Sequence, residues 1–301
     1  MDAFVFFKNI SSRNSMKFVL SIFTILTLYS FVGLISYDTK FVEKATLSDN
    51  IGHSYDLLFL KKTASQSKIK TKYFGETGSE TNSISERYLN WVKDKSIIYV
   101  TDVGFVDRYY APVGLSIENG KLLNRNLEHF DGLVIIFPSG GLIVTNLDSA
   151  NFRIPGRYEK TLDIRGSLLD KENFIEWAEK ENISAFQTQL LAFNDVLQIS
   201  PVSDSARRER RFLAICRSNQ TGEIIHAIVN SHEHISLFSA SLGTKKILNE
   251  FADLKIEALL NVDRGIQYVS FFFNEDGTVS NYMRGNFSIK QVTPLLAYYY
   301  Q

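Results

Sequence analysis

The feature that most constrains the fold is a succession of short apolar segments separated by strong turn signals. Asn119-Gly120 separates residues 113–117 from 121–123, and Ser139-Gly140-Gly141 separates 133–137 from 142–145. Such pairs favour tight hairpins because they accept positive φ angles. Segments of strand length also occur at 55–60, 68–74, 96–100, 186–193, 212–216, 224–229, 257–262, 268–273 and 278–283. Helical periodicity is confined to 85–92, 170–180 and 235–254. We therefore expect a mixed α+β domain in which strands dominate and a few helices pack against them.

Charge and cysteine content exclude several classes of protein. The 33 basic and 33 acidic residues balance, so nothing favours nucleic acid as a ligand. Cys216 is the single cysteine, which excludes an intramolecular disulfide and a cysteine-based zinc site. It lies in an apolar segment, where we expect a small buried residue.

The N-terminal region contains an uncharged apolar run at residues 18–37, long enough to span a bilayer as a helix. Lys8, Arg13 and Lys17 precede it, which places the N-terminus in the cytoplasm and the rest outside, periplasmic or at the cell surface. We expect a cytoplasmic tail at 1–17, a single-pass anchor at 18–37, a linker at 38–54 and an extracytoplasmic domain at 55–301. A cleaved signal peptide is the alternative, although the run is long for one and no Ala-x-Ala site follows it.

Short polar motifs permit two interpretations when each is taken alone. His232-Glu233-His234 could supply half of a metal site, but a solvated turn before a helix is the simpler interpretation, and we expect no metal and no cofactor. Asp263 could lie in a strand-end turn. The run of arginines at 207–211 could be a solvated basic surface, and Gln187 could be a hydrogen-bonded core amide.

Two neighbouring motifs carry a resemblance to a known family. Thr101-Asp102-Val103-Gly104-Phe105 is followed by Ala111-Pro112-Val113-Gly114-Leu115-Ser116-Ile117-Glu118-Asn119-Gly120-Lys121. Together they resemble the opening signature of the phosphodiester glycosidase domain, the family of the mannose-6-phosphate uncovering enzymes. Later segments match the family's pattern in the same order, and the resemblance covers roughly residues 54 to 275. These segments begin at Phe130-Asp131-Gly132, Ala185-Phe186-Gln187-Thr188, Arg207-Arg208-Glu209-Arg210 and Ala258-Leu259-Leu260-Asn261-Val262-Asp263.

The resemblance implies a hydrolase that acts on a sugar-1-phosphodiester in envelope glycan metabolism. Such chemistry needs a carboxylate near C1 and cationic groups for the phosphate. The resemblance assigns the catalytic carboxylate to Asp263, and Asp102, at the matching position of a family Asn, is the second catalytic candidate. Substrate binding falls to the following residues: Arg210, with Arg207 as second choice, Gln187, Thr188 and Arg264.

The chain departs from the family pattern at three places. Asp102 stands where the family has Asn, Gln189-Leu190 replaces Gly-Pro, and Arg264 interrupts a run of glycines. Glycines at such a turn let a ligand approach the backbone closely. The alternative is therefore a catalytically inactive relative that binds a glycan or a protein partner at the cell envelope. The sequence leaves the oligomeric state open.

Overall fold

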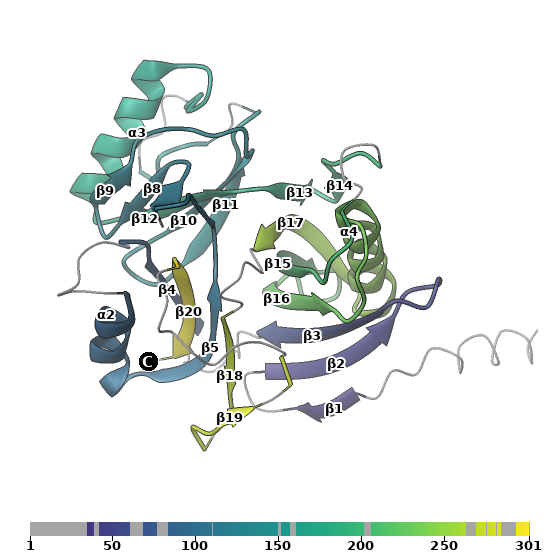
Figure 1. The fold of residues 1–301 in the computed structure, drawn as a ribbon. Coiled ribbons are helices and arrows are strands. Elements are labelled where there is room, and N and C mark those ends of the chain that lie inside the picture. The colour runs from purple at the N-terminus through teal and green to yellow at the C-terminus, as the bar shows by residue number, and fades with distance from the viewer. Residues whose placement is uncertain are drawn as a thin grey trace, which may run out of the picture.

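The structure is a computed structural model of the chain. It describes residues 35–38, 42–60, 69–76, 84–109, 111–149, 152–156, 161–201, 206–262, 269–274, 276–280, 282–283 and 293–300. Antiparallel strands dominate this part of the chain, and three α-helices accompany them, so the predicted strand-dominated α+β class is confirmed (Figure 1).

The large sheet contains eight strands among the described residues, in the order β1-β2-β3-β16-β15-β17-β13-β14. Its bounds are β1 Ile35–Asp38, β2 Val42–Ser48, β3 Ser54–Leu60, β16 Ile224–Ser231, β15 Arg211–Ser218, β17 Leu254–Val262, β13 Leu190–Phe193 and β14 Val196–Leu197. Helix α4 (Leu237–Lys246), continued by a π-helical turn at Ile247–Phe251, covers one face of this sheet (Figure 1). The Ser236 hydroxyl caps α4 by accepting a hydrogen bond from the Ser239 backbone N–H.

The hairpin sheet has the described order β11-β10-β12-β8-β9. Its bounds are β8 Ser116–Glu118, β9 Lys121–Asn124, β10 Gly132–Ile136, β11 Leu142–Asn146 and β12 Ser184–Thr188. Asn119 and Gly120 have φ angles of 48° and 78°, as the predicted Asn-Gly hairpin requires. Helix α3 (Leu168–Lys180) covers this sheet through Phe174, Trp177 and Ala178.

The terminal sheet has the described order β19-β18-β5-β20-β4. Its bounds are β4 Ile69–Phe74, β5 Ser96–Asp102, β18 Ser270–Phe273, β19 Val279–Ser280 and β20 Leu295–Tyr300. Helix α2 (Ile84–Trp91), followed by a 3₁₀ turn at Val92–Asp94, packs on its outer face. A short ladder pairs β6 (Phe105–Val106) with β7 (Pro112–Val113).

One central core joins the inner faces of all three sheets. It contains Leu58 and Leu213 from the large sheet, Val134 from the hairpin sheet, and Tyr99 and Leu296 from the terminal sheet. Because alternate residues of a strand face opposite sides, the same strands of the large sheet place Leu57, Phe212 and Leu259 against α4 on the other face. Packing on both faces of the large sheet therefore holds the polar residues at the ends of these strands in fixed positions.

The N-terminal region differs from the expected domain boundaries. Residues 38–54, expected to be a linker, include β2, which pairs along its whole length with β3. The expected anchor at 18–37 lies outside the described residues except for its last three, which belong to β1. Within the described part of the chain, no helix has the length and apolar character needed to cross a membrane.

Two further segments differ from their predicted secondary structure. The apolar run 186–193 was expected to be one strand, but the chain passes at Gln189 from β12 in the hairpin sheet to β13 in the large sheet. Helical structure in the segment 235–254 ends at Phe251, because Asp253 adopts a left-handed φ of 51° and Leu254 opens β17. The turn at Gln189 places Thr188 at the boundary of two sheets.

Candidate functional site

Asp102 ends β5 and is almost completely buried. Its position is fixed by strand pairing, since Asp102 opposes Leu295 of β20. The hydroxyl of the preceding Thr101 lies 3.3 Å from Asp102 Oδ1 and can donate to it. A carboxylate taken out of water in this way needs a cationic partner.

That partner is Arg211, the first residue of β15. Arg211 Nη1 lies 3.1 Å from Asp102 Oδ1, and the arginine side chain is 0% exposed. The same Nη1 donates to the Thr101 hydroxyl at 3.0 Å and to the Val269 carbonyl at 2.7 Å. Charge-assisted hydrogen bonds of this kind offset the desolvation of both ions. Sequence reasoning had considered Arg207 and Arg210 and missed Arg211, although its place at the start of a buried strand was a usable signal.

Arg211 belongs to a polar row that crosses the end of the large sheet. Its Nε donates to Asn230 Oδ1 at 2.9 Å, and strand register places Asn230 opposite Asp56. Asp56 accepts a hydrogen bond from the Thr46 hydroxyl at 2.7 Å and pairs with His232 at 2.6 Å. We call Asp56, Thr101, Asp102, Arg211 and Asn230 the strand-end cluster.

The strand-end cluster contains one buried donor that lacks a partner. Asn230 is 2% exposed, and its Nδ2 makes no hydrogen bond among the described residues. A buried amide N–H without an acceptor costs free energy comparable to a lost hydrogen bond.

Asp263 and Arg264 lie outside the described residues, but the chain on both sides of them is described. Val262 ends β17 and opposes Arg211 in the strand register. Val269 accepts a hydrogen bond from Arg211 through its carbonyl. The two described residues that flank 263–268, Val262 and Val269, therefore both lie beside Arg211.

Gln187 and Thr188 use their polar atoms within the protein. Gln187 Nε2 donates to the carbonyls of Glu128 and Phe130, and its Oε1 accepts from the backbone N–H groups of Leu115 and Glu128. The Thr188 hydroxyl donates to the Asn261 carbonyl at 2.7 Å. Gln187 thus fixes the loop before β10, as expected of a hydrogen-bonded core amide.

Arg210 and Arg207 lie apart from the Asp102–Arg211 pair. Arg210 donates from Nη2 to the Ala206 carbonyl at 2.6 Å and from Nε to the Ile235 carbonyl at 3.4 Å, so it braces the start of β15 against the chain before α4. Arg207 is exposed. Consecutive strand residues face opposite sides, which explains why Arg210 and Arg211 have different partners.

Asp131, in the motif Phe130-Asp131-Gly132, is a half-buried carboxylate just before β10. Burial raises the pKa of Asp131, with the Leu190 backbone N–H, 2.8 Å from Oδ1, opposing that shift. It precedes Gly132, which pairs with Thr188 where the chain changes sheets. Asp131 therefore anchors the start of β13 beside the point where the chain changes sheets.

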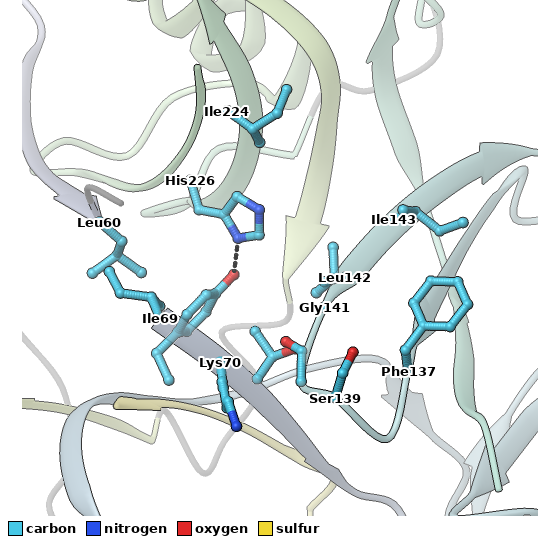
Figure 2. A pocket seen from close by; sticks show the side chains of 13 residues that line it. Leu60, Ile69, Lys70, Phe137, Ser139, Gly141, Leu142, Ile143, Ile224 and His226 are labelled. Carbon is cyan, nitrogen blue, oxygen red and sulfur yellow. Dashed lines mark hydrogen bonds between the residues drawn. The ribbon is translucent and has the colours of Figure 1, made fainter. Parts of the chain in front are cut away.

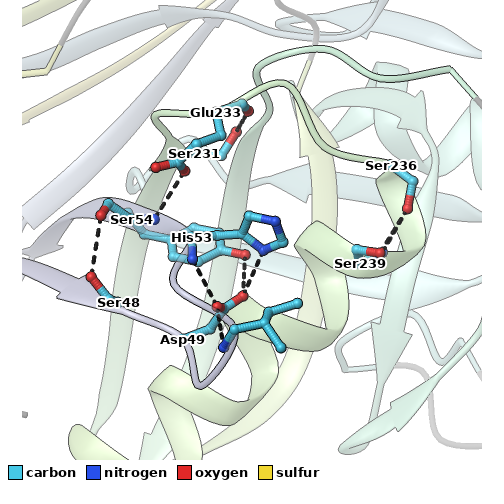
Figure 3. A network of polar contacts seen from close by, with 10 residues as sticks. Ser48, Asp49, His53, Ser54, Ser231, Glu233, Ser236 and Ser239 are labelled. Atoms are coloured by element: carbon cyan, nitrogen blue, oxygen red, sulfur yellow. Dashed lines mark hydrogen bonds and ion pairs between the residues drawn. The ribbon is translucent and has the colours of Figure 1, made fainter.

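A separate polar network lies at the turn between β2 and β3 (Figure 3). Asp49 accepts hydrogen bonds from the backbone N–H groups of Ile51 and His53, from the Tyr55 hydroxyl and from the His53 ring. Glu233 accepts from the Ser54 backbone N–H at 2.9 Å. His232-Glu233-His234 therefore serves this junction, and the described residues contain no group of three side chains that could hold a metal ion.

Comparisons with known proteins show a distant likeness of fold. No protein-family model and no curated protein sequence matches the chain. The catalytic domain of zebrafish N-acetylglucosamine-1-phosphodiester alpha-N-acetylglucosaminidase, auto-inhibited by its pro-peptide, has a TM-score of 0.48 at 13% identity, covering 87% of this chain and 84% of that chain.

Two bacterial structures are also similar to this chain. A hypothetical protein from Synechocystis has a TM-score of 0.48 at 11% identity over 87% of this chain and 63% of that one. An exported protein from Burkholderia pseudomallei has a TM-score of 0.38 at 10% identity, covering 82% of this chain and 74% of that chain. With TM-scores below 0.5, these likenesses assign neither a family nor an activity to the chain.

Proposed function

We propose that the domain is a hydrolase that cleaves a sugar-1-phosphodiester at the strand-end cluster, held at the membrane by the apolar run 18–34 that precedes β1, with the domain on the extracytoplasmic side. The observation that carries the proposal is the placement of Asp102 and Arg211. This buried pair lies where β17 ends, one residue before Asp263. The first motif, through Asp102, and the strand that leads to Asp263 are thus neighbours at one end of the large sheet.

The proposed reaction uses water to break the bond between C1 of the sugar and the phosphodiester oxygen. The phosphate monoester leaves as an anion, so little protonation of the leaving group is needed. Asp263 supplies the carboxylate at C1, as base or nucleophile, for an oxocarbenium-like transition state. Arg264 contacts the departing phosphate. Arg211, whose charge is balanced by Asp102, holds the described residues on either side of 263–268, pairing with Val262 in the strand register and donating to the Val269 carbonyl.

A second function is favoured by a different observation. Asp102, Gln187 and Thr188 already hydrogen-bond within the protein, so three of the residues expected to bind or cleave substrate have structural partners. A non-catalytic domain that binds a glycan or a protein partner at the cell envelope would use the same scaffold without turnover.

The test is hydrolysis of a chromogenic N-acetylglucosamine-1-phosphodiester by the full chain, beside Asp263→Asn and Arg211→Lys. We expect turnover in the unmodified protein, loss of kcat by at least about a hundredfold in Asp263→Asn, and a smaller loss in Arg211→Lys. Asp94→Asn is the matched control, because the Asp94 side chain is 76% exposed and pairs only with its neighbour Lys95 among the described residues.

Each outcome separates the two functions. Turnover that falls only in the two site variants supports the hydrolase. A protein that melts cooperatively but shows no turnover, while it retains N-acetylglucosamine-1-phosphate in a binding assay, supports the non-catalytic domain. Equal activity in Asp263→Asn and the control would exclude Asp263 as the carboxylate.

A further inference from the structure

A pocket of about 370 Å³ lies between the large sheet and the terminal sheet, away from the strand-end cluster (Figure 2). We call it the His226 pocket. His226 and Asn230 occupy the same face of β16, four residues apart, which corresponds to about 13 Å along a strand. The pocket therefore borders the opposite end of the central core from Arg211. Its volume falls within the range of small-molecule sites.

The walls of the pocket are mainly apolar. Leu60, Ile69, Leu142, Ile143 and Ile224 line it, and Phe137 adds an aromatic side chain (Figure 2). Lys70, Thr71 and Ser139 add polar side chains on the side of the β10–β11 turn, and none of the described lining residues is acidic, which disfavours a cationic ligand. An apolar body is the ligand part that such walls stabilise.

One polar pair is built into the wall of the pocket. The Tyr298 hydroxyl lies 3.0 Å from His226 Nδ1, and the two rings meet edge to face with centroids 5.7 Å apart. Burial raises the pKa of Tyr298, so the hydroxyl keeps its proton and can donate to the ring nitrogen. A polar pair in a mainly apolar wall fixes the orientation of a ligand.

The rim of the pocket is rigid on the side of the β10–β11 turn. The Gly140 carbonyl accepts hydrogen bonds from the backbone N–H of Thr71 at 2.8 Å and from its hydroxyl at 3.0 Å. A Cβ at Gly140 would lie 2.4 Å from Lys70 Cβ, so this turn packs directly on β4. The pocket is therefore preformed, which reduces the entropic cost of binding.

We propose that the His226 pocket binds a small neutral molecule with an apolar ring and one hydrogen-bonding group that contacts the His226–Tyr298 pair. The ring packs among the aliphatic walls and Phe137. The polar group hydrogen-bonds to the His226–Tyr298 pair. This site is independent of the hydrolase proposed above, since it shares no residue with the strand-end cluster.

The test is calorimetric titration of the full chain with 4-ethylphenol and with ethylbenzene, which differ by one hydroxyl. We expect saturable binding of both at one site, with 4-ethylphenol about fivefold tighter because it gains one hydrogen bond. In the double variant His226→Phe, Tyr298→Phe, which removes both members of the pair, the preference for 4-ethylphenol should disappear. Equal affinity in the unmodified protein would overturn the polar contact.

A variant that fills the pocket is the second test of the proposal. Gly141 lines it, and a Cβ there would meet its nearest atom at an ordinary 3.7 Å, so Gly141→Leu adds bulk without backbone strain. We expect at least tenfold weaker binding of both compounds. If Gly141→Leu does not melt cooperatively, Ile143→Trp replaces it, because Ile143 is 39% exposed.

Leu168→Ala is the control, since Leu168 is a 70% exposed leucine that does not line the pocket. It should bind both compounds as the unmodified protein does. An absence of saturable binding in the unmodified protein would overturn the proposal. Unchanged affinity in the pocket-filling variant, or a loss in Leu168→Ala as large as that variant's, would overturn it too.

Discussion

Arg211 and Asp102 are 109 residues apart in the sequence, and their side chains form an ion pair in which neither is more than 2% exposed. The pair joins β15 of the large sheet to β5 of the terminal sheet. It therefore couples the two sheets at the end where the site is proposed.

Removing Arg211 should destabilise the fold strongly. Arg211→Ala leaves the Asp102 carboxylate buried without its cation, and we expect the free energy of unfolding to fall by about 3–5 kcal/mol. Urea denaturation measures this. Arg125→Ala is the control, because the Arg125–Glu172 pair is 53% and 38% exposed and should contribute at most about 1 kcal/mol. Equal losses in the two variants would contradict a structural role for the buried pair.

Gly114 should tolerate no side chain. It has a φ of +82°, and a Cβ would lie 2.6 Å from Gln187 Oε1. Gly222→Ala is the comparison, because Gly222 has a φ of +71° and nothing within 4 Å of the added atom. Both variants incur backbone strain. The free energy of unfolding of Gly114→Ala should nevertheless fall by at least about 1 kcal/mol more than that of Gly222→Ala, because the Gln187 amide must shift. Thermal or urea unfolding measures this.

Asp49 should stabilise the fold only above acidic pH. Burial opposes ionisation, but hydrogen bonds from His53 and Ile51 outweigh it and lower the pKa of Asp49. A lowered pKa contributes stability above the unfolded value of about 3.9, and this stability is lost as pH falls through the folded pKa. We expect Asp49→Asn to be less stable than the unmodified protein at pH 7 and the gap to close below about pH 4. Urea denaturation across that range measures it.

Asp131 should show the opposite dependence. Burial raises its pKa, so the ionised carboxylate costs stability above the folded pKa, and that cost disappears as pH falls towards about 3.9. Asp131→Asn can still accept the hydrogen bond from Leu190. The stability of Asp131→Asn relative to that of the unmodified protein should increase as pH rises from 4 to 7. The midpoint of urea unfolding measures this difference. A constant difference over this range would contradict the assignment.

Cys216 should resist thiol reagents in the folded protein. It is completely buried, and burial raises its pKa, so little thiolate forms and reagent cannot reach it. We expect its reaction with a chromogenic disulfide reagent to require global unfolding and to become fast in denaturant. Rapid labelling without denaturant would contradict the packing of β15 against α4.

The hairpins and the buried pair show what the sequence could predict. Asn119-Gly120 specifies its turn by local backbone preference, so its position is readable from the residues themselves. Arg211 was missed because an arginine in a charged run normally indicates a solvated surface. Its burial depends on Asp102 and Val269, which reach it only through tertiary packing.

β20 shows a second limit of sequence reasoning. The sequence patterns predict no strand at residues 295–300. The segment Leu295–Tyr300 nevertheless pairs with β4 on one side and β5 on the other. Three consecutive tyrosines at 298–300 favour a strand, but nothing local specifies a central position.

The position of β20 has a consequence for synthesis of the chain on the ribosome. β4 and β5 are made early, but the strand that lies between them is made more than 190 residues after β5 ends at Asp102. Until then both strands expose unpaired edges, which are templates for pairing with other chains. The nascent protein thus depends on β20 to complete the terminal sheet. A ribosome that stalls before residue 295 leaves an aggregation-prone intermediate.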